Sequence, residues 1–211
     1  MLYFIFIIGA IFGSFYSLVG TRLPEERSIV KPGSHCEKCG HVLIWYENIP
    51  LISYIFLGGL CKKCKEPIGS IYFLMELLSA ALFALCYKVF GITPSFFLSL
   101  IIVSLVIIIF VSDSKFMIIN DSPLVVSLIL IFIIKWFDTG IISSLLSLLY
   151  GFIIFGVAYL LILFGYLVFK QEALGGGDIK LSFIAGMLLG VKLGIVYIVL
   201  ASFLAFHMLY I

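Results

Sequence analysis

Long apolar runs fill most of this chain, and one long polar stretch separates the first run from the rest. Runs that approach the length of a membrane span cover residues 2–19, 71–89, 94–111, 123–136 and 141–169. A helix needs roughly 20 apolar residues to cross the hydrocarbon core of a bilayer. Near the C-terminus, 179–189 has only half that length, and Gly190 separates it from a further run at 191–211. The pattern predicts an all-α, polytopic bundle of membrane helices.

The composition agrees with this prediction. Hydrophobic residues make up 64% of the 211 residues and charged residues only 11%, which leaves too little polar surface for a water-soluble protein. No basic segment precedes the first apolar run, so we expect a membrane helix there rather than a cleaved signal peptide. We expect three parts: a first transmembrane helix at 1–20, a polar module at 21–70 and a membrane domain at 71–211.

Four of the five cysteines form two Cys-x-x-Cys pairs in the polar module. They are Cys36 with Cys39 and Cys61 with Cys64. Two such knuckles are the usual means of holding one tetrahedral zinc ion. Chance spacing, disulfides and a redox pair are the alternatives. Cys86 lies in an apolar run, where a packed, inert thiol is expected.

The basic residues are distributed unevenly, although the net charge is only +2. Seven of the thirteen lysines and arginines lie in the polar module, and basic loops of membrane proteins stay on the cytoplasmic side. We therefore expect a cytoplasmic module and an N-terminus on the outer side. Counting spans onward brings Asp113 and Asp178 to the cytoplasmic side as well. The reducing cytosol favours zinc thiolates over disulfides.

Asp113 and Asp178 are the candidate catalytic residues. Asp178 follows Gly175-Gly176-Gly177, and glycines permit tight turns and the close approach of another chain. A simple helix cap at Asp178 and a solvated boundary residue at Asp113 are equally open readings. If the two carboxyl groups converged, they would share a proton. One could then take a proton from water while the other protonates the scissile amide, which is aspartyl protease chemistry.

Several motifs together resemble the type IV prepilin peptidases, a family of bifunctional GxGD-type membrane aspartyl proteases. The segments that carry the resemblance are Gly13-Ser14-Phe15, Arg22-Leu23-Pro24, the two cysteine knuckles with the loop 46–54 between them, the segment 113–121, and Leu174-Gly175-Gly176-Gly177-Asp178-Ile179-Lys180. The glycine motif alone is weakly specific, but the combined set is highly specific. The similarity runs from about residue 13 to about residue 190.

The resemblance implies a function and a set of roles. Asp113 and Asp178 would be the catalytic pair, Gly175 and Gly177 the fixed glycines of GxGD, and the four paired cysteines the ligands of a structural zinc ion. The family cleaves the basic leader of prepilins or pseudopilins at the cytoplasmic face of the bacterial inner membrane. It then methylates the new N-terminal residue with S-adenosylmethionine, in systems for pili, secretion or DNA uptake. The sequence ends at Ile211, before a basic loop and last span that the resemblance would lead us to expect.

Other polar residues receive supporting roles with open alternatives. Lys180 could orient a carboxylate or extend to the membrane interface. Glu47 and Asn48 could help to bind the methyl donor or the pilin N-terminus, or could simply shape their loop. Glu76 lies inside an apolar run and could position the methylated amine or form an interhelical hydrogen bond. Asp121 is a rival for the first carboxylate, and also a candidate cap for the helix that follows. His35 and His41 are expected to be neighbours of the first knuckle rather than ligands.

Two other classes of function stay open from the residues alone. A membrane carrier could use Asp113 and Asp178 for proton or cation coupling, and a non-catalytic scaffold of a secretion machine would need neither. Asparagine at either position separates the three hypotheses. It should abolish prepilin processing in a peptidase, abolish flux in a carrier and change neither in a scaffold. The expected partners are a prepilin or pseudopilin helix and membrane lipid, and not nucleic acid.

Overall fold

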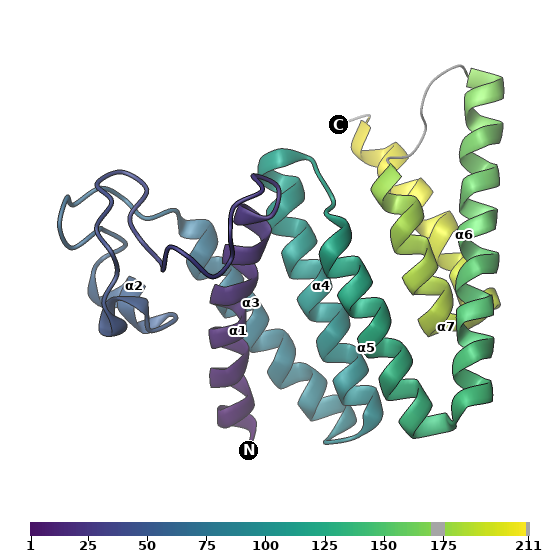
Figure 1. The fold of residues 1–211 in the computed structure, drawn as a ribbon, viewed down its shortest axis with the longest axis horizontal. Coiled ribbons are helices and arrows are strands. Elements are labelled where there is room, and N and C mark those ends of the chain that lie inside the picture. The colour runs from purple at the N-terminus through teal and green to yellow at the C-terminus, as the bar shows by residue number, and fades with distance from the viewer. Residues whose placement is uncertain (170–175, 210–211) are drawn as a thin grey trace. The chain divides into compact units, whose positions relative to one another are not determined.

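The computed structural model describes residues 1–169 and 176–209, and helices make up most of this part of the chain (Figure 1). Within these residues, six helices are long and apolar enough to cross a membrane, and the extended backbone is limited to two isolated β-bridges. The predicted all-α membrane bundle with a small polar module is therefore confirmed. The chain divides into two compact units, Met1–Asn120 and Asp121–Ile211, which are described in turn.

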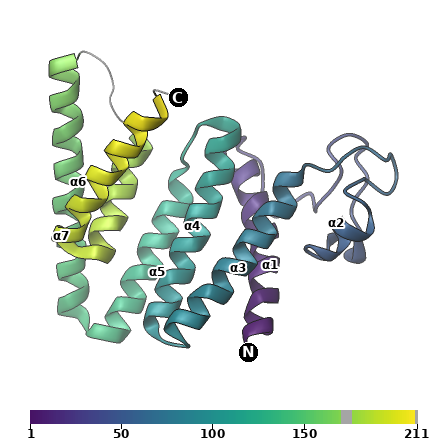
Figure 2. The same ribbon diagram turned by 180° about the vertical axis from the view of Figure 1, so that it is seen from behind.

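Three membrane helices form the body of the first unit. They are α1 (Leu2–Arg22), α3 (Ser70–Phe90) and α4 (Pro94–Phe116), and they pack on one another in all three pairs (Figures 1 and 2). Pro94 occupies the first turn of α4, and the Thr93 side chain accepts a hydrogen bond from the Phe96 amide at its start, a favourable N-terminal arrangement.

Small residues allow α1 and α3 to approach closely. An ideal Cβ at Gly9 would lie 2.8 Å from Cα of Ala80, and one at Gly13 would lie 2.8 Å from Cα of Glu76. No side chain fits at either position unless the helix backbones separate. Such contacts replace the hydrophobic driving force that is missing between helices in lipid.

The polar module leaves α1 and returns to α3. Its only helical segments are the short 3₁₀ helix η1 (Trp45–Asn48) and α2 (Ile52–Phe56), which contact each other. The rest consists of turns around the two cysteine knuckles. A module with so few apolar contacts of its own needs another source of stability.

Three further helices make up the second unit: α5 (Asp121–Thr139), α6 (Ile141–Phe169) and α7 (Gly176–Leu209). Only Gly140 separates α5 from α6, and its φ of 86° lies in the left-handed region that glycine tolerates best. α7 packs extensively on α6 and more lightly on α5.

α7 is a hairpin of two limbs, because Gly190 interrupts it with φ 74° and ψ −177°. The predicted break at this glycine is confirmed. The first limb is about 20 Å long, shorter than the roughly 30 Å of a hydrocarbon core. The two limbs meet where an ideal Cβ on Gly194 would lie 3.5 Å from Cα of Gly186, and the Ile154 side chain of α6 packs against both glycines.

A lysine of α5 stabilises the end of the first limb. Lys135 Nζ donates a hydrogen bond of 2.6 Å to the carbonyl oxygen of Met187. The break removes the intrahelical partners of the last carbonyls of this limb, and a cation is favoured at a helix C-terminus. Lys135 therefore supplies a donor at a point where the surroundings are otherwise apolar.

The helices extend beyond the apolar runs that predicted them. α4 was expected over 94–111 but continues to Phe116, so Asp113 lies inside its last turn rather than after it. The α4 ladder ends only where Met117 adopts φ 54° and its amide bonds to the Asp113 carbonyl. α5 similarly begins at Asp121 and ends at Thr139, beyond the predicted 123–136. Hydropathy marks where side chains become polar, whereas the helix continues until its hydrogen bonds stop.

Replacement of Gly13 by valine should weaken the packing of α1 on α3. The new side chain would meet the α3 backbone, and overpacking of a close contact costs about 2 kcal/mol. We expect a lower unfolding temperature of the purified protein in detergent. Gly156→Val is the matched control, because the structure places nothing within 4 Å of a Cβ at that glycine of α6. Equal destabilisation by both variants would contradict the proposed close contact.

Candidate metal centre and catalytic carboxylates

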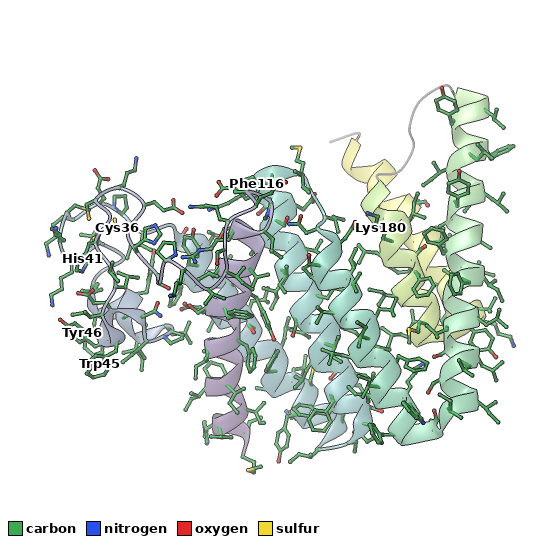
Figure 3. The ribbon with its side chains drawn as sticks, in the orientation of Figure 1. Cys36, His41, Trp45, Tyr46, Phe116 and Lys180 are labelled. Atoms are coloured by element: carbon green, nitrogen blue, oxygen red, sulfur yellow. The ribbon has the colours of Figure 1, made fainter. Side chains whose placement is uncertain are left out.

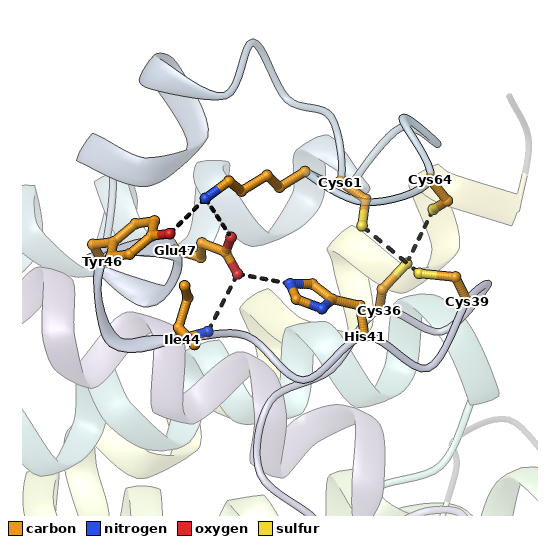
Figure 4. Close-up of polar contacts among 9 residues, drawn as sticks. Cys36, Cys39, His41, Ile44, Tyr46, Glu47, Cys61 and Cys64 are labelled. Atoms are coloured by element: carbon orange, nitrogen blue, oxygen red, sulfur yellow. Dashed lines mark hydrogen bonds and ion pairs between the residues drawn. The ribbon is translucent and has the colours of Figure 1, made fainter.

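The four paired cysteines converge on one point (Figure 4). All four sulfur atoms lie within 4.8 Å of one another, with 3.7 Å between Cys36 Sγ and Cys64 Sγ and 3.9 Å between Cys39 Sγ and Cys61 Sγ. Metal–sulfur bonds of about 2.3 Å in a tetrahedron require separations of about 3.8 Å. A disulfide would require about 2.05 Å. The cluster could therefore hold a metal ion.

The two knuckles share one backbone design. The Cys36 amide donates to the His41 carbonyl, and the Gly40 amide donates back to Cys36. In the second knuckle, Cys61 and Glu66 take the places of Cys36 and His41, and Lys65 takes the place of Gly40. Gly40 and Lys65 both have a positive φ, 68° and 59°. Each knuckle thus turns through a left-handed residue directly after its second cysteine.

The protein lowers the cost of ionising one thiol of the cluster. The backbone amides of Cys64 and Lys63 donate to the Cys61 sulfur and lower the pKa of that thiol to about 6. The Glu66 amide also lowers the pKa of Cys64, but burial and the neighbouring thiols outweigh it and raise the pKa to about 12. Several thiolates so close together repel one another, and a bound cation removes that repulsion.

Glu47 joins the two knuckles through His41 of the first and Lys62 of the second (Figure 4). Its buried side chain accepts hydrogen bonds from His41 Nε2 at 3.0 Å and from the Ile44 amide at 3.2 Å, and Lys62 Nζ lies 3.6 Å from its other oxygen. Burial raises the pKa of this carboxyl group, but the Ile44 amide, His41 and Lys62 outweigh burial and hold the pKa below its ordinary value. The observed contacts thus make Glu47 a link between the knuckles.

Glu76 and Arg22 attach the polar module to the membrane helices. Glu76 Oε2 on α3 accepts a hydrogen bond of 2.8 Å from the Leu51 amide. The buried Arg22 guanidinium at the end of α1 donates to three backbone carbonyls at the start of the module, those of Ser28, Pro32 and Gly33. Glu76 also has a side-chain hydrogen bond with Ser14 of α1, so it holds a loop and forms the interhelical bond that the sequence suggested as the alternative. The anchoring role of Arg22 was not anticipated, although a lone arginine directly after an apolar run was a usable signal.

Asp113 is exposed in the last turn of α4. The turn that follows is fixed, because the Ser112 hydroxyl donates to the Ile118 carbonyl. Lys115, two residues further on, donates to the Tyr72 hydroxyl of α3 at 3.3 Å. A carboxylate at a helix C-terminus gains nothing from the helix dipole, so α4 itself offers no reason for an aspartate at this position.

Asp178 lies in the first turn of α7, where the dipole favours a negative charge. It borders a small cavity between the two α7 limbs and α6, with a volume of about 30 Å³, roughly that of one water molecule. Ser182, Tyr197 and Ser202 also line this cavity. Tyr197 also interacts electrostatically with the Asp178 carboxylate. Ser182 lies one turn after Asp178 on the first limb and was not predicted. Tyr197 and Ser202 were not predicted either, because only the reversal at Gly190 brings the second limb to Asp178.

The remaining residues predicted for the site are Lys180, Gly177, Gly175 and Asn48. Lys180 forms an ion pair with Asp121, so it tethers the start of α7 to the start of α5. Gly177 is half-buried in the first turn of α7, and Gly175 lies outside the described residues. Asn48 is exposed, and its side chain makes no hydrogen bond to the described residues. Asp113 and Asp178 belong to different units, and their pairing stays a prediction.

The helices and the cysteine cluster define a multi-pass membrane protein with an attached module that could bind a metal ion. Residues 7–90 match the family model of the bacterial peptidase A24 N-terminal domain, and residues 100–210 match that of the type IV leader peptidase family. The chain belongs to the type IV leader peptidase family. The resemblance inferred from the motifs is thus confirmed, and the carrier hypothesis gains no support.

Similar proteins carry the name prepilin leader peptidase/N-methyltransferase. One from Myxococcus xanthus is 39% identical over 83% of this chain, one from Bacillus subtilis 37% over 92%, and one from Vibrio cholerae 31% over 95%. The chain spans about half the length of the first relative, 52%, and 75% and 82% of the other two. No solved structure matches the chain.

The metal centre can be tested by substitution. We expect the purified protein to contain about one metal ion per chain, and Cys61→Ser to lose it because three thiolates and a hydroxyl bind far more weakly. Elemental analysis of the purified protein measures the content. Cys86→Ser is the matched control, since this fifth cysteine lies on α3 and outside the cluster. Full metal content in Cys61→Ser would exclude the assigned ligand set.

Proposed function

We propose that the protein is a prepilin leader peptidase and N-methyltransferase that cleaves the basic leader of a prepilin or pseudopilin and methylates the new N-terminus. The observation that carries the hydrolytic half is the water-sized cavity against Asp178 in a family of leader peptidases. A peptidase inside an apolar helix bundle has to hold both a carboxylate and water. The named relatives supply the substrate class.

Asp113 and Asp178 are the proposed catalytic pair, with different tasks. Asp178, at a helix N-terminus that favours its charge, removes a proton from the attacking water. Asp113, at a helix C-terminus, holds the proton that it gives to the carbonyl oxygen of the scissile peptide. When the tetrahedral intermediate collapses, the C–N bond breaks and a proton passes to the leaving nitrogen. The products are a leader carboxylate and a free amine.

Both aspartates are proposed to face the same compartment as the cysteine module. Within the first unit, Gly20 of α1 packs against Val111 of α4, so Asp113 lies at the end of the unit from which the module leaves. Only residues 117–120 separate α4 from α5, too few to cross the bilayer. Within the second unit, the ion pair of Lys180 with Asp121 joins the start of α7 to the start of α5. The positive module makes this the cytoplasmic face of the bacterial inner membrane.

The metal in the module is proposed to be structural zinc. Four thiolates complete a tetrahedron and leave no open position for catalysis, so the ion would contribute to folding rather than to the chemistry. S-adenosylmethionine would supply the methyl group for the second reaction, and the new amine would have to be unprotonated to accept it. Glu76 is a proposed support for this step through its hold on the module.

Asparagine at either proposed catalytic position should abolish cleavage. We expect Asp113→Asn and Asp178→Asn each to reduce prepilin cleavage by at least about a thousandfold, because each variant lacks one of the two proton transfers that the reaction needs. Mass spectrometry of a purified prepilin incubated with reconstituted protein measures both cleavage and methylation.

Asp138→Asn is the control, since this aspartate lies at the opposite end of α5 from Asp121. Each variant should retain its metal and its unfolding temperature. Normal cleavage by a folded Asp113→Asn or Asp178→Asn protein would exclude that residue from catalysis.

Tyr197→Phe should slow cleavage without weakening substrate binding. Loss of a hydroxyl beside the charged Asp178 costs about 1.4 kcal/mol, which corresponds to about a tenfold lower kcat, while KM should not change. Tyr159→Phe on α6 is the matched control, because this side chain is 54% exposed on the outer surface of the bundle. An unchanged kcat in Tyr197→Phe would show that the Tyr197 hydroxyl does not contribute to the cleavage step.

A further inference from the structure

The polar module carries a large apolar surface of its own. Its members are side chains of η1 and α2, two segments that contact each other. This apolar tip consists of Trp45, Tyr46, Ile52, Ile55 and Phe56, and their exposed fractions range from 39% for Tyr46 to 86% for Phe56. Exposed apolar groups gathered in this way mark a surface that binds another protein or a membrane.

The apolar tip lies beside a membrane helix, and not beyond its end. The Leu51 amide, one residue before α2, bonds to Glu76 in the second turn of α3. Tyr54 of α2 stacks on Phe73 of α3 with 5.0 Å between ring centroids. At 1.5 Å per residue, Glu76 lies about 9 Å along α3 from its first residue. α2 is therefore attached alongside the part of α3 that enters the apolar layer.

Figure 3 places the apolar tip at a similar depth along the membrane helices. Cys36 lies near the level at which α1 ends, whereas Trp45 and Tyr46 lie level with the middle of α1. The metal cluster thus occupies the outer part of the module, and the apolar tip points along the membrane helices.

We propose that the apolar tip is inserted into the lipid bilayer, so that the module is an interfacial domain rather than a free loop. Interfacial segments bury apolar side chains roughly 5–10 Å into the boundary between headgroups and acyl chains, which matches the attachment point on α3. Tryptophan and tyrosine are the residues most enriched at this boundary.

Charge next to the tip favours anionic lipid as the occupant. Lys62 donates to the Tyr46 hydroxyl and lies over its ring at 4.7 Å, so an ammonium group borders the aromatic part of the tip. Lys63 and Lys65 are exposed on the same knuckle. Lysines near an anionic membrane surface strengthen attachment, and their long stems reach the headgroups while the tip stays in the apolar layer.

Tryptophan fluorescence can test this proposal because the chain contains only two tryptophans, Trp45 and Trp136. A Trp136→Phe protein reports on Trp45 alone, and a Trp45→Phe protein reports on Trp136 in the membrane helix α5. Both full-length, metal-loaded proteins are reconstituted in phosphatidylcholine vesicles, with and without phosphatidylglycerol. Quenching is measured with acyl chains brominated near the headgroup and with iodide in the buffer.

Insertion predicts that brominated lipid lowers Trp45 emission at least about twofold, while iodide has little effect, and that phosphatidylglycerol increases the lipid quenching. Trp136 should be quenched by lipid in every preparation, which confirms reconstitution. Strong quenching of Trp45 by iodide would overturn the proposal. So would protection from both quenchers, which would mean a protein contact, or protection only after a prepilin is added, which would make the tip a substrate site.

A second variant separates insertion from folding. Phe56→Asp places a charge on the most exposed side chain of the tip and should abolish the lipid quenching of Trp45 while the protein keeps its metal. Unchanged lipid quenching in this variant would count against insertion through α2. None of these measurements depends on peptidase activity, so they can fail or succeed independently of the proposed function.

Discussion

Backbone polar groups in an apolar layer must find partners within the protein, and this constraint explains the least regular parts of the structure. Where α7 breaks at Gly190, Lys135 donates to the Met187 carbonyl. Where the loop backbone runs beside α3, Glu76 accepts from the Leu51 amide. Glu76 and Lys135 are therefore placed where a nearby backbone group has no partner within a helix.

The same constraint gives the cysteine module its attachment. The module has little core of its own, and its order comes from the sulfur cluster, from Glu47 between the knuckles, and from Arg22 and Glu76 at its two points of contact with membrane helices. The sulfur cluster orders the two knuckles, whereas Arg22 and Glu76 hold the module on the membrane helices. Loss of the metal should loosen the knuckles, whereas loss of an anchor should alter the position of an intact module.

The sequence predicted the features that depend on local chemistry. Apolar runs located the membrane helices, the spacing of the cysteines indicated a metal cluster, and Gly190 was identified as a break. The features that depend on tertiary contacts were missed. No local pattern says that Lys180 pairs with Asp121, or that Tyr197 returns to Asp178. Glu76 was recognised as unusual, but its bond to the Leu51 amide, 25 positions earlier, involves a backbone group that has no side-chain signature.

The hairpin of α7 has a consequence for how this unit must be assembled. The wall of the cavity beside Asp178 comes from residues about twenty positions downstream, on the opposite limb. During synthesis the glycine motif and its aspartate enter the membrane first, but their surroundings are complete only after the chain has reversed at Gly190. A polypeptide interrupted at that glycine would contain both acidic side chains and still lack the environment in which one of them could hold water.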